Sequence, residues 1–160
     1  MKRLFGFIGT AALIMMALSF VPACDDDDDN PVTPTTGSIS GTVDFRGTWP
    51  TTGQVQISVF QTYPPSGPPD AFTDPISPTT SFNYRFDGLD PANYAAVVVG
   101  WLDPNLPPGQ EKILGYYWAD VDSVAVDGNG TPQVLPLSVD VEAGETDSHI
   151  DMAADLDVAP

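Results

Sequence analysis

Hydrophobic and polar residues alternate along much of the chain after residue 36, with the period of two that is typical of half-buried strands. In the segment QVQISVF, for example, Val55, Ile57 and Val59 share one face and the polar residues share the other. The segment NYAAVVVGWL is apolar on both faces and therefore fits a central strand. These patterns predict strands at 38–45, 54–60, 82–86, 93–102, 112–118, 122–126, 133–139 and 148–152.

Turn residues separate the predicted strands, and no segment after residue 36 shows the period of a helix. The chain has 17 Pro and 14 Gly among its 160 residues, concentrated in stretches such as 64–69 and 127–130. Seven or eight short strands in about 120 residues are typical of an all-β sandwich. The long spacing between Tyr63 and Thr80 favours a crossover or a long loop over a simple meander.

The first 23 residues have a different pattern, with two basic residues followed by a continuous apolar stretch. Lys2 and Arg3 precede the stretch 4–20, and small Ala23 follows it. This layout is typical of a secretory signal peptide. A retained membrane helix is the alternative, but 17 residues are at the lower limit for spanning a bilayer.

The residues around the single cysteine, Val21-Pro22-Ala23-Cys24, resemble a bacterial lipobox. The resemblance implies that residues 1–23 are a lipoprotein signal peptide, that cleavage occurs before Cys24, and that Cys24 is acylated. Several acyl chains anchor a protein in a membrane far more firmly than one chain does. Lipidation would also explain why the chain has one cysteine, which cannot form an internal disulfide.

Residues 25–36 predict an extended, disordered spacer. Five aspartates are followed by NPVTPTT, and a run of like charges next to prolines is normally solvated rather than metal-binding. With Cys24, these residues form a tether that reaches up to about 40 Å. The acidic run is similar to that of surface-exposed lipoproteins of Bacteroidota-like bacteria, which implies an outer-membrane or cell-surface location. In enterobacteria an Asp after the lipidated Cys implies retention in the inner membrane, so the sequence leaves the leaflet open.

Three segments of the domain at 37–156 resemble carboxypeptidase regulatory-like domains. They are GSISGTV at 37–43, FNYRFDGLDPANYAAVVV at 82–99 and VEAGETDSHIDM at 141–152. The resemblance implies a single Ig-like, transthyretin-like β-sandwich of about seven strands. It also implies that the Tyr94 ring is buried and that its hydroxyl caps nearby backbone. Residues 157–160 are then a short tail.

Charge and composition exclude several functions. Removal of Lys2 and Arg3 with the signal peptide leaves three basic residues against 22 acidic ones, a net charge of −19. Such a surface repels nucleic acid, which we exclude as a partner. One histidine, His149, and no GxSxG motif argue against an enzyme, because nucleophilic catalysis needs a base beside the nucleophile. The composition indicates no cofactor, with calcium as the one candidate ligand.

Candidate binding residues fall into two groups. Exposed aromatic rings can stack on sugars, whereas the alternative is that these rings plug the core. Acidic turn residues are candidate ligands for a weak calcium site, although Asp-Gly and Asn-Gly pairs are also ordinary turn residues. The carbohydrate candidates are Trp101, Tyr116, Tyr117 and Trp118. The calcium candidates are Asp120, Asp122, Asp127 and Asn129. A third set, predicted to share one face of the last strand, is Asp147, His149 and Asp151.

Together these features predict a cell-envelope lipoprotein, held in the membrane by lipid, that presents a non-catalytic β-sandwich with a structural, adhesive or binding role. An envelope protein or a glycan is the expected partner. A carbohydrate-binding lipoprotein is one alternative, and it requires exposed rings on one face. A calcium-dependent adhesion module is another, and it requires acidic residues clustered at one end of the sandwich.

Overall fold

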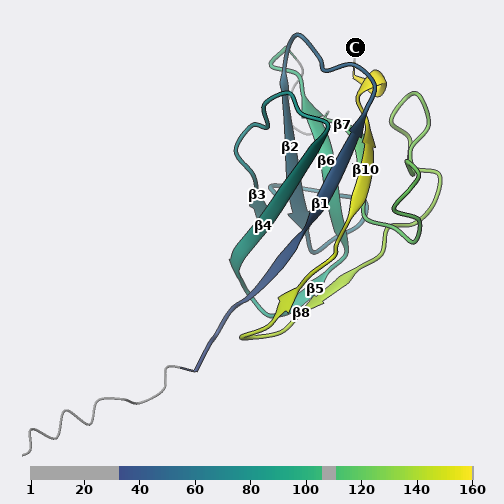
Figure 1. Ribbon diagram of the computed structural model, residues 1–160. Helices are drawn as coiled ribbons and strands as arrows, with labels where there is room; N and C mark the ends of the chain where they lie inside the picture. Colours follow the sequence, from purple (N-terminus) through teal and green to yellow (C-terminus); the bar gives the residue numbers. More distant parts are fainter. Residues whose placement is uncertain (1–32, 106–110, 160) are drawn as a thin grey trace, which may run out of the picture. The chain divides into compact units, whose positions relative to one another are not determined.

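The computed structural model describes residues 33–105 and 111–159, which form ten β-strands and one short 3₁₀ helix, η1 (Figure 1). No α-helix occurs within these two ranges. The all-β fold class predicted from the sequence is confirmed. The elements are β1 (Gly37–Arg46), β2 (Gln54–Phe60), β3 (Ala71–Phe72), β4 (Ser81–Leu89), β5 (Ala92–Tyr94), β6 (Ala96–Leu102), β7 (Lys112–Tyr116), β8 (Val139–Val141), β9 (Thr146–Asp147), β10 (Met152–Asp155) and η1 (Leu156–Val158).

The strands form two layers that pack face to face as a sandwich (Figure 1). One sheet has the order β10-β1-β4, and β9 also pairs with β1; the other has the order β3-β2-β6-β7. β1 is antiparallel to β4 but parallel to β10, so the chain crosses between the layers rather than forming a simple meander. β5 and β8 make a small third sheet at one end of the sandwich (Figure 1).

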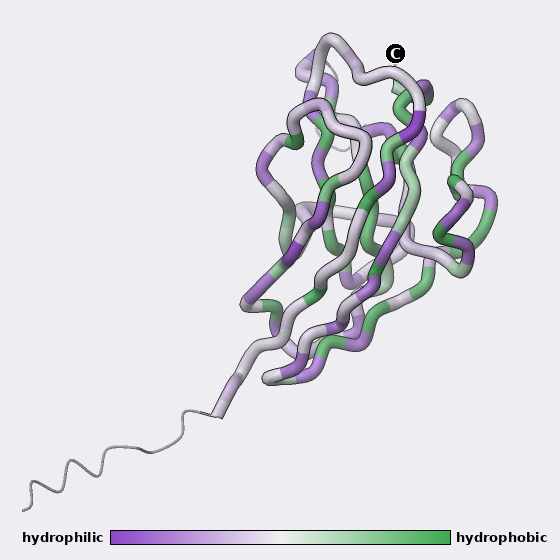
Figure 2. The backbone as a smooth tube through the Cα atoms, viewed as in Figure 1, coloured by the Kyte–Doolittle hydropathy of each residue, from purple (hydrophilic) through white to green (hydrophobic). Residues whose placement is uncertain are grey.

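The core between the layers is built from the apolar members of each alternating strand. Val55, Ile57 and Val59 of β2 lie buried opposite the inward residues of β6, as their alternation predicts. Figure 2 shows apolar positions recurring along the strands of both layers. Burial of such side chains contributes about 1.5–3 kcal/mol each, so this shared core is the main source of stability.

The two layers come close together where β7 lies beside β10. A Cβ atom added to Gly115 of β7 would lie 2.1 Å from the backbone oxygen of Ala153 in β10. Gly41 of β1 is equally crowded, because its added Cβ would lie 2.1 Å from the backbone oxygen of Ile150. At both positions the absence of a side chain lets two backbones meet.

Three predicted strands are not formed, and one predicted strand is divided. Of the predicted strand 148–152, only Met152 belongs to a strand, β10. Residues 122–126 and 133–138 lie in the long segment between β7 and β8, where Val126 and Pro132 make one isolated bridge, and Val139 begins β8. Residues 93–102 divide at Ala95 into β5 and β6, which belong to different sheets. Ala125 of the long segment packs over the outer face of a sheet, in the cluster around Tyr116, whereas Val134, Leu135 and Leu137 are exposed.

The last part of the sandwich departs from the predicted alternation because of a bulge at His149. Ile39 of β1 pairs with Asp147 of β9, and Val43 of β1 pairs with Met152 of β10. The chain therefore takes five steps from Asp147 to Met152 opposite four steps from Ile39 to Val43 in β1, one residue more. His149 absorbs the extra residue with a φ of 64°. The prediction that Asp147, His149 and Asp151 share one strand face is therefore wrong, and Asp151 instead accepts a hydrogen bond from backbone N of Thr42.

The domain continues beyond residue 156, where the sequence predicts its end. Val158 is 2% exposed and belongs to the core, and Asp157 accepts a hydrogen bond from the backbone N of Thr48. Residues 157–159 are thus part of the packed domain rather than a tail. At the other end, Gly144 donates its backbone N–H to the carbonyl of Thr36, close to the predicted domain start.

Candidate functional site

The outer face of the β10-β1-β4 sheet is polar, and its side chains hydrogen-bond to one another. The Ser38 hydroxyl donates to the Asp87 carboxylate at 2.8 Å, and Arg85 forms a 2.7 Å ion pair with the same carboxylate. The Thr42 hydroxyl donates to the Asn83 side chain at 2.9 Å. The Ser38 hydrogen bond, then the Arg85 hydrogen bond, hold the pKa of Asp87 below its ordinary value. These contacts leave a polar, solvated surface.

The outer face of the opposite sheet carries a groove of about 920 Å³, and we call it the β2–β6 groove. Its floor is formed by outward residues of β2, β6 and β7. One wall is the proline-rich segment that runs from Tyr63 to Pro69 before β3. The floor consists of Gln56, Ser58, Phe60, Val98, Gly100, Leu102 and Ile113, and the walls of Tyr63, Pro64, Pro65, Gly67, Pro68, Pro69, Phe72, Glu111 and Pro132.

Strand pairing explains why this surface is both apolar and hollow. Ser58 pairs with Val98, and Gln56 pairs with Gly100, so two residues with little or no side chain, Ser58 and Gly100, lie in the middle of the floor. Gly100 has no side chain to fill the space above it. Proline lacks a backbone N–H, so the prolines of the wall cannot all pair as residues of a strand. The wall segment is therefore a loop beside the sheet instead of a further strand in it.

The groove offers much apolar surface and few polar groups. Its volume lies within the range of about 300–1,000 Å³ that is usual for ligand sites. The Gln56 amide already donates to the carbonyl of Thr73 at 2.8 Å, which leaves the Ser58 hydroxyl as the central polar group of the floor. His149, the one imidazole in the chain, is absent from the groove lining. The arrangement suits binding of an apolar group.

The sequence predicted neither the groove nor its residues, although two signals pointed towards it. The segment 93–102 is apolar on both faces, which predicts a second buried surface beside the core. The spacing between Tyr63 and Thr80 predicts a long loop, and part of that loop forms the groove wall. Which surface the loop covers depends on contacts between distant segments, which periodicity does not reveal.

The proposed carbohydrate-stacking residues do not form an exposed platform. Trp101 and Tyr116 are both 0% exposed, so the prediction for these two rings is wrong. Trp101 points into the core, and its indole N–H donates to the carbonyl of Thr52 at 2.9 Å. Tyr117 and Trp118 are half-buried, and both pack against core clusters. All four rings therefore pack in or against the hydrophobic clusters, which is the alternative to sugar stacking that the sequence left open.

The aromatic residues at the ends of the sandwich are also engaged in packing. Trp49 packs on Phe45 with ring centroids 4.9 Å apart and donates to the carbonyl of Thr79 at 2.8 Å. Tyr94 is 1% exposed, and its hydroxyl donates to the carbonyl of Asp90 at 3.0 Å. The expected burial and backbone capping of Tyr94 are confirmed, while the family resemblance that implied them stays a prediction.

The carboxylates of the candidate calcium residues Asp120 and Asp127 accept hydrogen bonds from groups within their own turns. The Asp120 carboxylate accepts hydrogen bonds from the Asp122 backbone N and the Ser123 hydroxyl. The Asp127 carboxylate accepts from the backbone N–H groups of Thr131 and Asn129, and these bonds lower its pKa. Within residues 33–105 and 111–159, no three His, Cys, Asp or Glu residues are grouped so that they could hold a metal ion.

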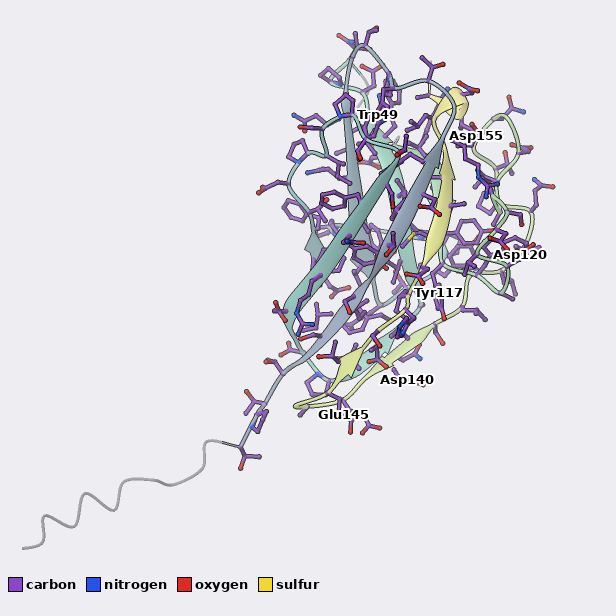
Figure 3. The ribbon with its side chains drawn as sticks, viewed as in Figure 1. Trp49, Tyr117, Asp120, Asp140, Glu145 and Asp155 are labelled. Carbon is purple, nitrogen blue, oxygen red and sulfur yellow. The ribbon has the colours of Figure 1, made fainter. Side chains whose placement is uncertain are left out.

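The charged residues of the described part of the chain are scattered, and its basic residues are engaged. Figure 3 shows Asp155 near one end of the domain, Asp140 and Glu145 near the other, and Asp120 on the long segment between β7 and β8. The three basic side chains that the structure describes each donate to an acceptor within the chain. The pairs are Arg46 with the carbonyl of Asp122, Arg85 with Asp87, and Lys112 with the carbonyl of Val158.

The predicted lipidation residues, Val21, Pro22, Ala23 and Cys24, and the five aspartates after them lie outside the described residues. In the part of the chain that the structure describes, no helix has the length and apolar character needed to cross a membrane. No protein-family model, curated protein or solved structure matches this chain.

Proposed function

We propose that the chain is a lipid-anchored protein of the cell envelope whose β-sandwich is a non-catalytic binding module. The observation that carries the binding role is the contrast between the two outer faces of the sandwich. One face is polar with its side chains paired to one another, whereas the other holds the apolar β2–β6 groove. A purely structural domain would not require such a groove.

The anchoring part of the proposal depends on the residues before the sandwich. Lys2, Arg3 and the apolar stretch that follows fit a secretory signal, and Val21 to Cys24 fit a lipobox. Acylation of Cys24 would hold the chain in the membrane, and the acidic spacer would separate the sandwich from it. The high negative charge favours this separation, because anionic headgroups repel an acidic surface.

The non-catalytic part depends on the side chains that line the groove. Its hydroxyl and carboxyl groups belong to Ser58, Tyr63 and Glu111, and no imidazole or amine lines it. A nucleophilic hydroxyl needs a neighbouring base that is itself oriented by a third group. The lining instead consists mainly of prolines, aliphatic side chains and aromatic rings, which supply contact area rather than proton transfer.

Membrane fractionation of cells that express the full chain or the Cys24→Ser variant tests the anchor. The full chain should stay in the membrane pellet after washing with high salt and alkaline carbonate, and detergent should release it. The Cys24→Ser variant should lose the acyl label from a fed fatty-acid analogue. An acyl label that persists in the variant would overturn the proposal.

A further inference from the structure

We propose that the β2–β6 groove binds an extended, apolar peptide segment that carries lysine or arginine residues at its flanks. This inference rests on the proposed binding function and names the chemistry of the partner. The partner is a segment of another protein of the envelope rather than a second copy of this chain. Three properties of the groove lead to this choice: its apolar lining, its dimensions and the charge of its rim.

The apolar lining requires apolar side chains in the ligand. Phe72 stands at the groove wall and is 61% exposed, which is unusual for so large a ring. Beside it lie Pro68 and Pro69 from the wall and Phe60 from the floor. Flat rings and prolines present rigid contact area, so little side-chain freedom is lost when a ligand covers them.

The dimensions of the floor fit a short extended peptide. The floor spans β2, β6 and β7, three strands that lie about 4.8 Å apart and give a width of about 10 Å. Along β2 it runs from Gln56 to Phe60, which corresponds to about 13 Å at about 3.3 Å per residue. Four or five residues of an extended peptide cover this length, roughly, at the same rise per residue.

The rim of the groove is acidic. Glu111 lines it, and Asp70 and Asp103 directly follow the lining residues Pro69 and Leu102 in the chain. The Asp70 carboxylate also accepts hydrogen bonds from Gln61, and the Asp103 carboxylate accepts them from Asn105. Lys112 is the one basic residue in the strands of this sheet, and it donates to the carbonyl of Val158 at 3.2 Å, away from the floor. Basic flanks on the ligand would therefore meet carboxylates on the rim.

The same charges argue against other occupants. A second copy of this chain would also carry a net charge of −19 after cleavage, so the two copies would repel each other. Anionic lipids and free fatty acids would meet the acidic rim. A glycan would find few free hydrogen-bonding groups, since the Gln56 amide is already engaged.

The test uses the mature full-length protein, purified from membranes in a neutral detergent and labelled with a fluorophore. The probe is a synthetic peptide library with four-residue cores drawn from Val, Leu, Phe, Trp and Pro. Each core is flanked by Lys-Lys, by Glu-Glu or by Ser-Ser. We expect lysine-flanked peptides to bind about tenfold more tightly than glutamate-flanked peptides with the same core, and we expect this ratio to fall with salt.

Two serines provide a matched pair of variants. Ser58 and Ser40 are both half-buried, outward residues in the middle of a strand, but Ser58 lines the groove and Ser40 lies on the opposite sheet. Ser58→Arg should weaken binding at least about tenfold, whereas Ser40→Arg adds the same charge and should leave binding within about twofold. Phe72→Ala removes an exposed groove ring and should weaken binding about threefold or more, even if Ser58→Arg fails to fold.

Several results would overturn the inference. These are equal binding of glutamate-flanked peptides, no binding by any peptide, and unchanged binding in both Ser58→Arg and Phe72→Ala. Binding of neutral phosphatidylcholine vesicles that Ser58→Arg abolishes, with no peptide bound, would assign the groove to lipid instead. None of these results affects acylation of Cys24, so failure of the peptide inference is distinguishable from failure of the anchor.

Discussion

Substitution of Gly115 by alanine tests the packing of the two layers where β7 meets β10. The added methyl carbon would lie 2.1 Å from the backbone oxygen of Ala153 and 3.0 Å from the Cα atom of Ala154. A carbon–oxygen contact in sheets is normally about 3.3 Å, so β7 and β10 would have to separate by about 1.2 Å. Both obstructing atoms belong to the backbone of β10, which cannot rotate away as a side chain could.

Overpacking of a core by one methyl group costs typically about 1–3 kcal/mol, and backbone obstruction places Gly115→Ala near the top of that range. A destabilisation of about 3 kcal/mol corresponds to a fall in Tm of about 10 °C for a domain of this size. Thermal unfolding followed by circular dichroism measures the change directly.

Gly128→Ala is the matched control. Gly128 has no atom within 4 Å of an added Cβ and no positive φ, so alanine should change Tm by less than about 2 °C. Equal Tm values for Gly115→Ala and the unmodified protein would refute the close approach of β7 and β10, and with it the proposed packing of the layers.

Three further predictions concern hydrogen bonds to the backbone. Tyr84→Phe removes the buried hydroxyl that donates to the carbonyl of Ile150 beside the bulge, and urea unfolding should show a loss of about 1–2 kcal/mol; no loss would contradict this contact. Tyr116→Phe removes the hydroxyl that lies between two carbonyls of the long segment, so amide exchange within 125–134 should accelerate while exchange in the sheets does not. The Asp127 carboxylate should titrate below its ordinary pKa of 3.8 in carbon-13 NMR, because its hydrogen bonds favour the charged form. Its contribution to stability is then complete above pH 3.8 and is lost as pH falls through the lower pKa of the folded state, and a midpoint at or above 3.8 would contradict the turn.

Strands that bury one face could be predicted because the alternation itself encodes their structure. β2 begins at Gln54 and ends at Phe60, as the pattern predicts, since each apolar residue in it faces the core. The same reasoning failed for residues 122–126 and 133–139. Ala125 packs on the outer face of a sheet without pairing, whereas Val134, Leu135 and Leu137 are exposed, and the local pattern alone distinguishes neither case from a half-buried strand.

Neither the bulge at His149 nor the groove could be predicted from the sequence, and the reason differs between the two. The bulge is set by the register of β9 and β10 against β1, a contact between segments about 110 residues apart, as the pairing of Ile39 with Asp147 shows. The groove arises because a proline-rich loop stands over outward residues of three strands. Whether an aromatic ring is exposed also depends on which distant segments cover it. The sequence alone therefore allowed Trp101 and Tyr116 to be surface residues, although both are buried.

The central claim is that the sandwich is held in the membrane by lipid on Cys24. Mass spectrometry of the N-terminal proteolytic fragment of the membrane-extracted protein tests this claim most directly. We expect a fragment that begins at Cys24, lacks Val21 to Ala23, and carries the added mass of several acyl chains. A fragment that begins at any other residue, or a Cys24 with an unmodified thiol, would contradict it.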